Sequence, residues 1–187
     1  MDLKSLTMEK SKQVLILVDE TGRKKGHASR LECHTGKGKK HLAFVVFLKN
    51  DQGKFLIQKR RHELWDNFWD VSATSHPEHL NGRDETLEEA AEKCLERELG
   101  VSAETENVGF FDYYAEHPGN KCENEHCAVL VGMLEKEVTP NPSEVYEVKW
   151  ALLGEIEKEI NENGKEFTPW IKHTLKLLKG RKPELFK

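Results

Sequence analysis

Short apolar runs separated by turn residues dominate the first part of the chain. Residues 14–18 form one such run and lead into an Asp-Glu-Thr-Gly turn. Residues 42–48 and 55–57 are apolar on either side of Asn-Asp-Gln-Gly at 50–53, which is the pattern of a β-hairpin. Residues 69–74 form a further run that ends shortly before Pro77. Each of these runs is predicted to be a β-strand.

The clearest helical pattern begins at residue 87. Thr86 and Glu89 have the spacing of a capping box, in which each residue's side chain satisfies a backbone amide of the other, and Gly100 is a typical helix stop. Residues 87, 90, 91, 94, 95 and 99 form the apolar stripe. Glu98 falls on or beside this stripe. Its carboxylate is therefore either buried for a functional reason or placed at the stripe edge with its head in water.

The rest of the chain continues with strands and then helices. Strands are predicted at residues 108–114, 123–134 and 145–150, and amphipathic helical segments at 152–160 and 170–178. No internal repeat or linker divides the sequence. We therefore predict one α/β domain over residues 1–187, with an α/β/α sandwich fold and a mixed sheet.

Glu123 and Glu125 are unusual for their position. They open a segment that is otherwise mostly apolar through residue 134 and that is predicted to be buried on both faces. Because side chains alternate along a strand, both carboxylates point to the same side, where burial and mutual repulsion favour a bound cation. The alternative is a strand that enters from solvent with a charged edge.

Three histidines strengthen the case for a metal. His34 and His41 flank a Gly- and Lys-rich loop, residues 35–40, that lacks the Gly-x-x-x-x-Gly-Lys-Ser/Thr pattern of a nucleotide-binding P-loop. A solvated loop is the commoner fate of such a sequence, but two histidines joined by glycines can also converge on one cation. His76 supplies a third imidazole at the end of a predicted strand. Three imidazoles and two carboxylates suit Mg²⁺ or a divalent transition metal in an octahedral shell.

Composition narrows the class of protein. Charged residues make up 33% of the 187 residues, hydrophobic residues 37%, and the formal net charge is -4. These values argue against a general attraction to nucleic acid or to anionic membranes. No apolar stretch reaches the length of a membrane helix, and the first residues lack the apolar core of a signal peptide, so a cytoplasmic location is expected.

The four cysteines are expected to be thiols rather than disulfides in such a compartment. A zinc site is conceivable, but its spacing matches no common structural zinc site. Its ligands would be Cys33, His34, Cys122 and Cys127.

Most of the chain resembles the type I isopentenyl diphosphate isomerases of the Nudix superfamily. The resemblance implies a metal site for Mn²⁺, Zn²⁺ or Mg²⁺ with five ligands, which are His34, His41, His76, Glu123 and Glu125. It also implies that Glu98 helps to hold a second Mg²⁺ that is bound to the diphosphate of a small-molecule substrate. Tyr113 matches the tyrosine that assists the catalytic glutamate, here Glu125, and Trp170 matches a tryptophan whose π-face steadies a carbocation.

The helix differs from that of ordinary Nudix pyrophosphohydrolases. Their motif has an Arg-Glu-apolar-x-Glu-Glu-x-Gly core that gathers several carboxylates on one helix, whereas residues 93–100 keep only Glu98 among these core carboxylates. Glu85 falls on the earlier glutamate of the motif, although a longer preceding loop blurs that spacing. The isomerases have lost the motif in the same way, so this departure favours the isomerase-like branch.

Thr74 is the main departure from the isomerases, which carry a cysteine at this place, two residues before His76. A thiol with a pKa near ~8.5 can exchange a proton near neutral pH, whereas an aliphatic hydroxyl ionises far higher. Thr74 therefore predicts slow isomerisation or none. Its backbone carbonyl still matches a ligand of the second Mg²⁺ in that family, because this role does not need the side chain.

The residues expected to bind the diphosphate are also fewer than in the isomerases. Arg30 and Arg60 match basic residues that hold it, but a lysine after Arg60 is deleted and a helix arginine is replaced by Cys94. Lys59, Arg61 and the lysines of residues 37–40 are alternative contacts for the diphosphate.

Three activities are compatible with these residues, and we rank them in the following order. The first is an isomerase-like enzyme that protonates an isoprenoid diphosphate from Glu125 and removes a proton through a group other than cysteine. The second is a metal-dependent diphosphate hydrolase that uses metal-bound water. The third is a non-catalytic protein that binds a diphosphate.

Overall fold

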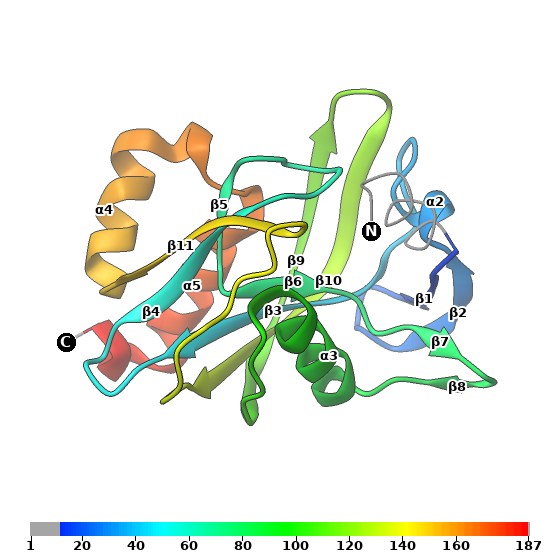
Figure 1. The fold of residues 1–187 in the computed structure, drawn as a ribbon. Coiled ribbons are helices and arrows are strands. Elements are labelled where there is room, and N and C mark those ends of the chain that lie inside the picture. Colours follow the sequence, from blue (N-terminus) through cyan, green and yellow to red (C-terminus); the bar gives the residue numbers. More distant parts are fainter. Residues whose placement is uncertain (1–11, 187) are drawn as a thin grey trace.

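A mixed β-sheet forms the centre of this computed structural model, which describes residues 12–186 (Figure 1). The longest path through the sheet follows the order β11 (Val145–Ala151), β4 (Phe55–Arg60), β3 (His41–Lys49), β1 (Val14–Val18) and β2 (Lys24–Ser29). Strand β10 (Lys121–Met133) pairs in parallel with β3 and in antiparallel with β9 (Thr105–His117). Two short strands, β5 (Trp69–Asp70) and β6 (Ala73–Ser75), pair with β4 and β3 respectively.

Helices cover both faces of this sheet (Figure 1). Helix α3 (Leu87–Leu99) packs on one face, and α4 (Leu153–Asn163) and α5 (Pro169–Arg181) pack on the other. Val45 and Phe47 of β3 belong to the α4/α5 core, whereas Phe44 and Val46 belong to the α3 core. This arrangement explains the uninterrupted apolar run at 42–48, because both sides of the strand are buried. The predicted α/β/α sandwich is confirmed.

Helix α3 has the ends that its sequence predicts. The Thr86 side chain accepts a hydrogen bond from the backbone amide of Glu89, whose own side chain accepts one from the amide of Thr86, and Gly100 ends the helix in the left-handed conformation with φ of 67°. Glu98 is fully buried, so its position at the stripe edge with a solvated head is excluded.

Several elements differ from the sequence-based expectation. The predicted strand at 69–74 is divided into β5 and β6 because Ser72 leaves the ladder, donating from its Oγ to the carbonyl of Leu56 (2.7 Å) and accepting from the amide of Leu48 (2.8 Å). The polar loop after His76 contains a small hairpin of β7 (His79–Leu80) and β8 (Arg83–Asp84). Other short elements that the sequence did not predict are α2 (Arg30–Cys33), η1 (Gly164–Glu166) and η2 (Pro183–Phe186).

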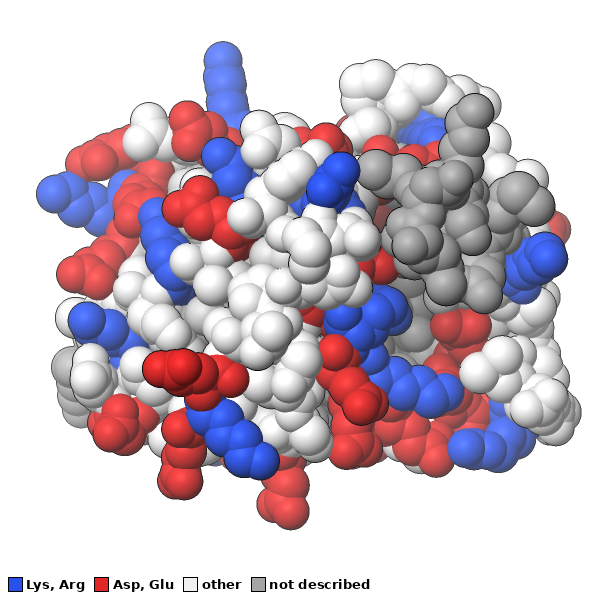
Figure 2. Space-filling view, in the orientation of Figure 1, with Lys and Arg blue, Asp and Glu red and all other residues white. Residues whose placement is uncertain are grey.

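Surface charges of both signs and buried cysteines are the remaining general features of the fold. Acidic and basic side chains are interspersed on the face shown in Figure 2. Within residues 12–186, none of the helices combines the length and the apolar character needed to cross a membrane. All four cysteines are buried thiols.

Candidate metal and diphosphate site

Strand register places Glu125 between two predicted site residues. Glu125 lies opposite His41 in the parallel pairing with β3 and opposite Tyr113 in the antiparallel pairing with β9. Tyr113 Oη donates a hydrogen bond of 2.6 Å to Glu125 Oε2. Alternation along β10 puts Glu123 and Glu125 on the same face as Cys127, the face covered by α5.

Three buried imidazoles surround these carboxylates. His34, which follows α2, has its Nδ1 at 2.9 Å from Glu123 Oε2. His76 Nε2 lies 2.9 Å and His41 Nε2 3.6 Å from Glu125 Oε1. The ring centroids of the three histidines are 4.7, 4.9 and 5.1 Å apart. Ligand atoms from His34, His41, His76 and Glu123 all lie within 4.8 Å of one another, and Glu125 adjoins them.

The donor atoms of this cluster fit a divalent metal. His34 Nε2 and His41 Nε2 are buried and have no hydrogen-bond partner among the described residues. Leaving two such nitrogens unsatisfied is costly, and a metal ion between them would remove the cost. Imidazole and carboxylate donors together suit Mn²⁺ or Zn²⁺. None of the metal-type clusters found among residues 12–186 contains a cysteine, so nothing in this part of the chain supports the alternative cysteine site.

Burial and mutual contacts shift the pKa values of the clustered side chains. Burial lowers the pKa of His34 to about 3 and that of His76 well below its ordinary value, so both imidazoles are neutral. Burial also opposes protonation of His41, but contacts with Cys33 and Glu125 outweigh it and raise the pKa of His41 to about 10.

The pKa values of the two glutamates are shifted in opposite directions. Burial and the charge of Glu125 raise the pKa of Glu123, whereas close contacts with His41 and His76 outweigh burial and hold the pKa of Glu125 low. Metal binding would therefore displace protons held by Glu123 and His41.

A pocket opens beside this cluster and carries several cationic side chains. Arg30 Nη1 reaches the cluster itself and donates a 3.0 Å hydrogen bond to His76 Nδ1. Three arginines in one pocket suit a polyanion such as a diphosphate. The pocket is lined in part by Arg30, Arg60, His62, Thr74, His76, Arg97, Tyr113, Glu123, Glu125 and Trp170.

The alternative cations proposed from the sequence do not line this pocket. Lys59 lies over the ring of Trp69, and Arg61 donates to the carbonyl of Pro142. Lys39 and Lys40 form ion pairs with acidic residues outside the pocket. Arg97 and His62, which the sequence did not single out, lie in the pocket instead.

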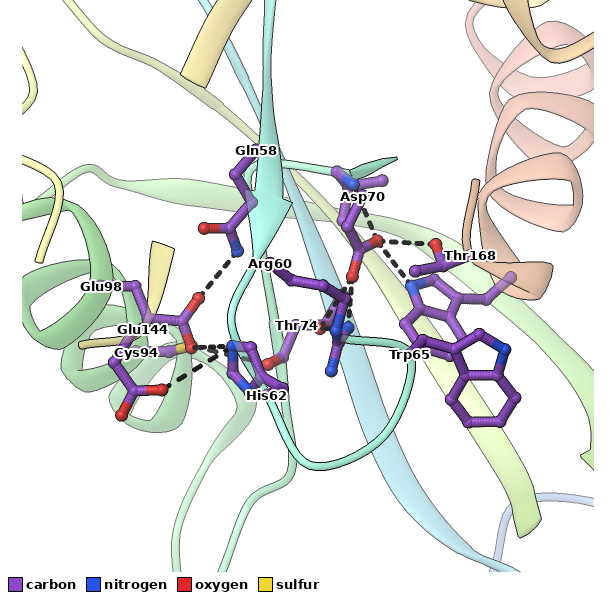
Figure 3. Close-up of polar contacts among 12 residues, drawn as sticks. Gln58, Arg60, His62, Trp65, Asp70, Thr74, Cys94, Glu98, Glu144 and Thr168 are labelled. Carbon is purple, nitrogen blue, oxygen red and sulfur yellow. Dashed lines mark hydrogen bonds and ion pairs between the residues drawn. The ribbon is translucent and has the colours of Figure 1, made fainter. Parts of the chain in front are cut away.

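Thr74 is held by two charged neighbours (Figure 3). Arg60 Nη1 donates to Thr74 Oγ1 at 3.1 Å, and Thr74 Oγ1 donates to Asp70 Oδ2 at 3.3 Å. Asp70 also accepts hydrogen bonds from Arg60 Nη1 and from Trp170 Nε1, at 2.5 and 2.7 Å. We did not predict a role for Asp70, although one carboxylate inside the apolar run at 69–74 was a signal.

Glu98 contacts the pocket wall without being part of it. Its Oε1 accepts a hydrogen bond from Arg97 Nη2 (2.8 Å) and lies 3.8 Å from His62 Nε2, and both of these partners line the pocket. Cys94 lies between Glu98 and Thr74, with its Sγ at 3.3 Å from Glu98 Oε1 and 3.7 Å from the carbonyl oxygen of Thr74.

A second group of metal-type ligands forms around Glu98 (Figure 3). Glu144 is buried, and its Oε2 lies 3.7 Å from His62 Nε2. The sequence reasoning identified Glu98 but missed Glu144 and His62, which adjoin it only through tertiary packing. Two carboxylates and an imidazole next to the arginines are suitable neighbours for a Mg²⁺ ion that accompanies a phosphate.

Comparisons with known proteins agree with the observed fold. A sequence model of the NUDIX domain matches residues 39–171. The chain is 32% identical over 163 residues to an isopentenyl-diphosphate Delta-isomerase of Brevibacterium linens, and this match covers 85% of this chain and 87% of that protein. It is 36% identical over 151 residues to a protein of the same name from Haloarcula marismortui, and this second match covers 77% of this chain and 79% of that protein.

Solved structures show the same architecture at lower identity. The protein DR0079 from Deinococcus radiodurans gives a TM-score of 0.68 at 20% identity, over 88% of this chain and 98% of that one. A MutT NUDIX hydrolase from Burkholderia pseudomallei gives a TM-score of 0.58 at 17% identity, over 75% of this chain and 98% of that one. At these identities the likeness concerns the fold.

Proposed function

Because this chain belongs to the Nudix family and is related to isopentenyl diphosphate isomerases, we propose that it is a metal-dependent enzyme that catalyses an allylic 1,3-proton shift in a small diphosphate. One observation carries the proposal. A buried cluster of three histidines and two glutamates adjoins a pocket that contains three arginines, and Glu125 belongs to both.

In this proposal the metal cluster and the cationic pocket have separate tasks. His34, His41, His76, Glu123 and Glu125 would hold Mn²⁺ or Zn²⁺, which supplies positive charge that orients Glu125 and stabilises its ionised form. Arg30, Arg60 and Arg97 would bind the diphosphate, and Glu98 lies where it can help to hold a Mg²⁺ bound to that group.

Glu125 and Tyr113 are the proposed groups for proton transfer on one face of the double bond. Their 2.6 Å hydrogen bond gives the proton a path to the pocket, which both residues line. Trp170 lines the same pocket, and the guanidinium carbon of Arg60 lies 5.0 Å from the centroid of its ring. The indole face is therefore placed where it attracts positive charge, as a carbocation would require.

A diphosphate hydrolase is the second candidate, and two observations favour it. Position 74 has a hydroxyl, bonded to Arg60 and Asp70, in place of a thiol. The group formed by His62, Glu98 and Glu144 lies beside the arginines and could hold an additional metal ion. In that reaction a water molecule attacks phosphorus and the phosphoanhydride bond breaks. A protein that binds a diphosphate without turnover is the third candidate.

A product assay distinguishes the three candidates. The protein is incubated with isopentenyl diphosphate and with a panel of nucleoside and prenyl diphosphates, in the presence of Mg²⁺ and Mn²⁺, while isomer and released phosphate are measured together. We expect isomer without phosphate. Phosphate release would support the hydrolase, and tight binding without either product would support the non-catalytic relative. The Glu125→Gln variant provides the background for both measurements.

A further inference from the structure

We infer that Asp70 is a positioning residue, which holds Arg60 so that Nη2 of its guanidinium can contact a phosphate group. The inference rests on the proposed function, because it concerns how the same pocket would hold a diphosphate. It assigns a role in ligand binding to a carboxylate that lies behind the pocket wall.

Asp70 is completely buried in the short strand β5 and makes an unusually full set of hydrogen bonds. A carboxylate has about four lone-pair sites, and the five hydrogen-bond donors around Asp70 occupy all of them. Asp70 therefore has no capacity left for a metal or a substrate and must act through the groups it holds. Its donors are Arg60 Nη1, Thr74 Oγ1, Thr168 Oγ1, Trp170 Nε1 and the amide of Val71.

Arg60 is held by one end only. Its Nη1 makes the contacts with both Asp70 and Thr74, whereas its Nε is buried and has no hydrogen-bond partner among the described residues. A guanidinium carries five N–H donors in a fixed fork, so anchoring Nη1 and burying Nε leaves Nη2 as the group that can reach a ligand. Its two N–H donors suit the oxygens of a phosphate, and Arg60 lines the pocket.

The same carboxylate also fixes the aromatic wall of the pocket. Trp170 reaches Asp70 from α5 and Arg60 reaches it from β4, and the guanidinium lies over the indole ring. Asp70 therefore sets the distance between a cation that would bind phosphate and the ring that would face the rest of the substrate. Loss of its negative charge should release the guanidinium before it disturbs the ring, because an amide oxygen can still accept from Trp170 Nε1.

A double-mutant cycle tests whether Asp70 acts through Arg60. The dissociation constant for inorganic diphosphate with Mg²⁺ is measured by calorimetry for wild type, Asp70→Asn, Arg60→Gln and the double variant. We expect Asp70→Asn to weaken binding by about tenfold or more, and to have less than about a twofold effect when Arg60 is already replaced. Wild-type affinity in Asp70→Asn, or an equal loss in both backgrounds, would overturn the inference.

Thr168→Val is the matched control. Thr168 donates a 3.0 Å hydrogen bond to the same carboxylate but does not line the pocket, so its replacement should lower the unfolding temperature and leave the affinity within about threefold of wild type. A tenfold loss of affinity in this control would mean that any disturbance of the buried network has the same effect, and would overturn the specific role of the Arg60 contact.

Arg60→Lys provides an independent test if Asp70→Asn does not fold. It keeps the buried charge pair, but an ammonium that binds Asp70 has no second nitrogen that could donate to a phosphate. We expect about a tenfold loss of affinity, and wild-type affinity would overturn the inference. Failure of the wild-type protein to bind diphosphate at all would instead overturn the proposed function, on which the inference depends.

Discussion

Thr74 shows how one side chain limits the proton transfers that this pocket can carry out. Its hydroxyl is bonded to Arg60 and Asp70, so it is a well-ordered polar group with no tendency to ionise near neutral pH. The wild-type protein should therefore form isomer slowly. Wild-type turnover of isopentenyl diphosphate at roughly 1 s⁻¹ or faster would contradict this expectation.

Thr74→Cys should raise isomer formation, because it restores a group that can exchange a proton. A positioned acid or base contributes about 10²–10⁴ in rate, and the smaller set of diphosphate contacts sets an upper limit on the gain. Thr74→Val, which is similar in size but cannot exchange a proton, is the control and should give no increase. If Thr74→Cys folds and binds metal but yields no isomer, the hydrolase or the binding protein becomes the better account.

The buried histidines predict how stability depends on pH in the metal-free protein. The pKa of His34 is about 3 in the folded chain, against an ordinary value of 6.5, so the unfolded chain binds more protons between these values. Stability contributed by neutral His34 is therefore present above pH 6.5 and is lost as the pH falls towards 3. Between pH 7 and pH 5, the free energy of unfolding should fall by roughly 1–2 kcal/mol less in His34→Gln than in wild type. Urea unfolding with a chelator present measures this difference. Equal losses would show that His34 does not titrate in this way.

At the scale of elements, the loop at residues 35–40 determines how His34 and His41 approach each other. Gly38 has a φ of 60°, and an added Cβ would lie 2.4 Å from the Cys33 carbonyl oxygen and 2.6 Å from Cys122 Sγ. Gly36 has a similar φ of 67°, but no atom lies within 4 Å of its added Cβ. The two glycines therefore share the backbone requirement and differ in their surroundings.

Gly38→Ala should weaken metal binding, whereas Gly36→Ala should only lower stability. Both variants incur the cost of a left-handed alanine, about 1–2 kcal/mol, but only the change at 38 displaces the backbone beside His34. The measurement is the rise in unfolding temperature on addition of Mn²⁺, compared between the two variants. An equal rise in both would show that the loop does not control the geometry of the ligands.

The elements that could be predicted from the sequence are those with an apolar or a capping signal. The run at 42–48 is apolar because β3 is buried on both faces, and Thr86 and Gly100 mark the ends of α3. Strand β2 was not predicted, because its sequence, Lys-Lys-Gly-His-Ala-Ser, has no apolar pattern. It lies at the end of its sheet path and is held mainly by backbone hydrogen bonds to β1. The metal-type ligands have a recognisable order along the chain, whereas Asp70 and Glu144 meet their partners only through tertiary packing.

At the scale of the whole molecule, the cluster of three histidines and two glutamates joins segments that are far apart in the chain. The cluster draws on the end of α2, on β3, on the segment after β6 and on β10, so a bound metal should stabilise the folded state as a whole. A ligand present at 100 times its dissociation constant adds about 2.7 kcal/mol. Mn²⁺ should raise the unfolding temperature of wild type but not that of His41→Asn. His126→Gln is the control and should respond like wild type, because the His126 side chain lies on the other face of β10. A rise in His41→Asn equal to that of wild type would place the metal elsewhere.

Deuterium incorporation tests the central claim most directly, because it detects proton transfer to the double bond even when turnover is slow. The metal-loaded protein is incubated with isopentenyl diphosphate in D₂O, and mass spectrometry follows deuterium in the substrate and product while released phosphate is measured in the same sample. We predict that deuterium enters the C5 skeleton without phosphate release, and that Glu125→Gln and removal of the metal both abolish it. Phosphate release without deuterium, or deuterium incorporation that persists in Glu125→Gln, would contradict the account.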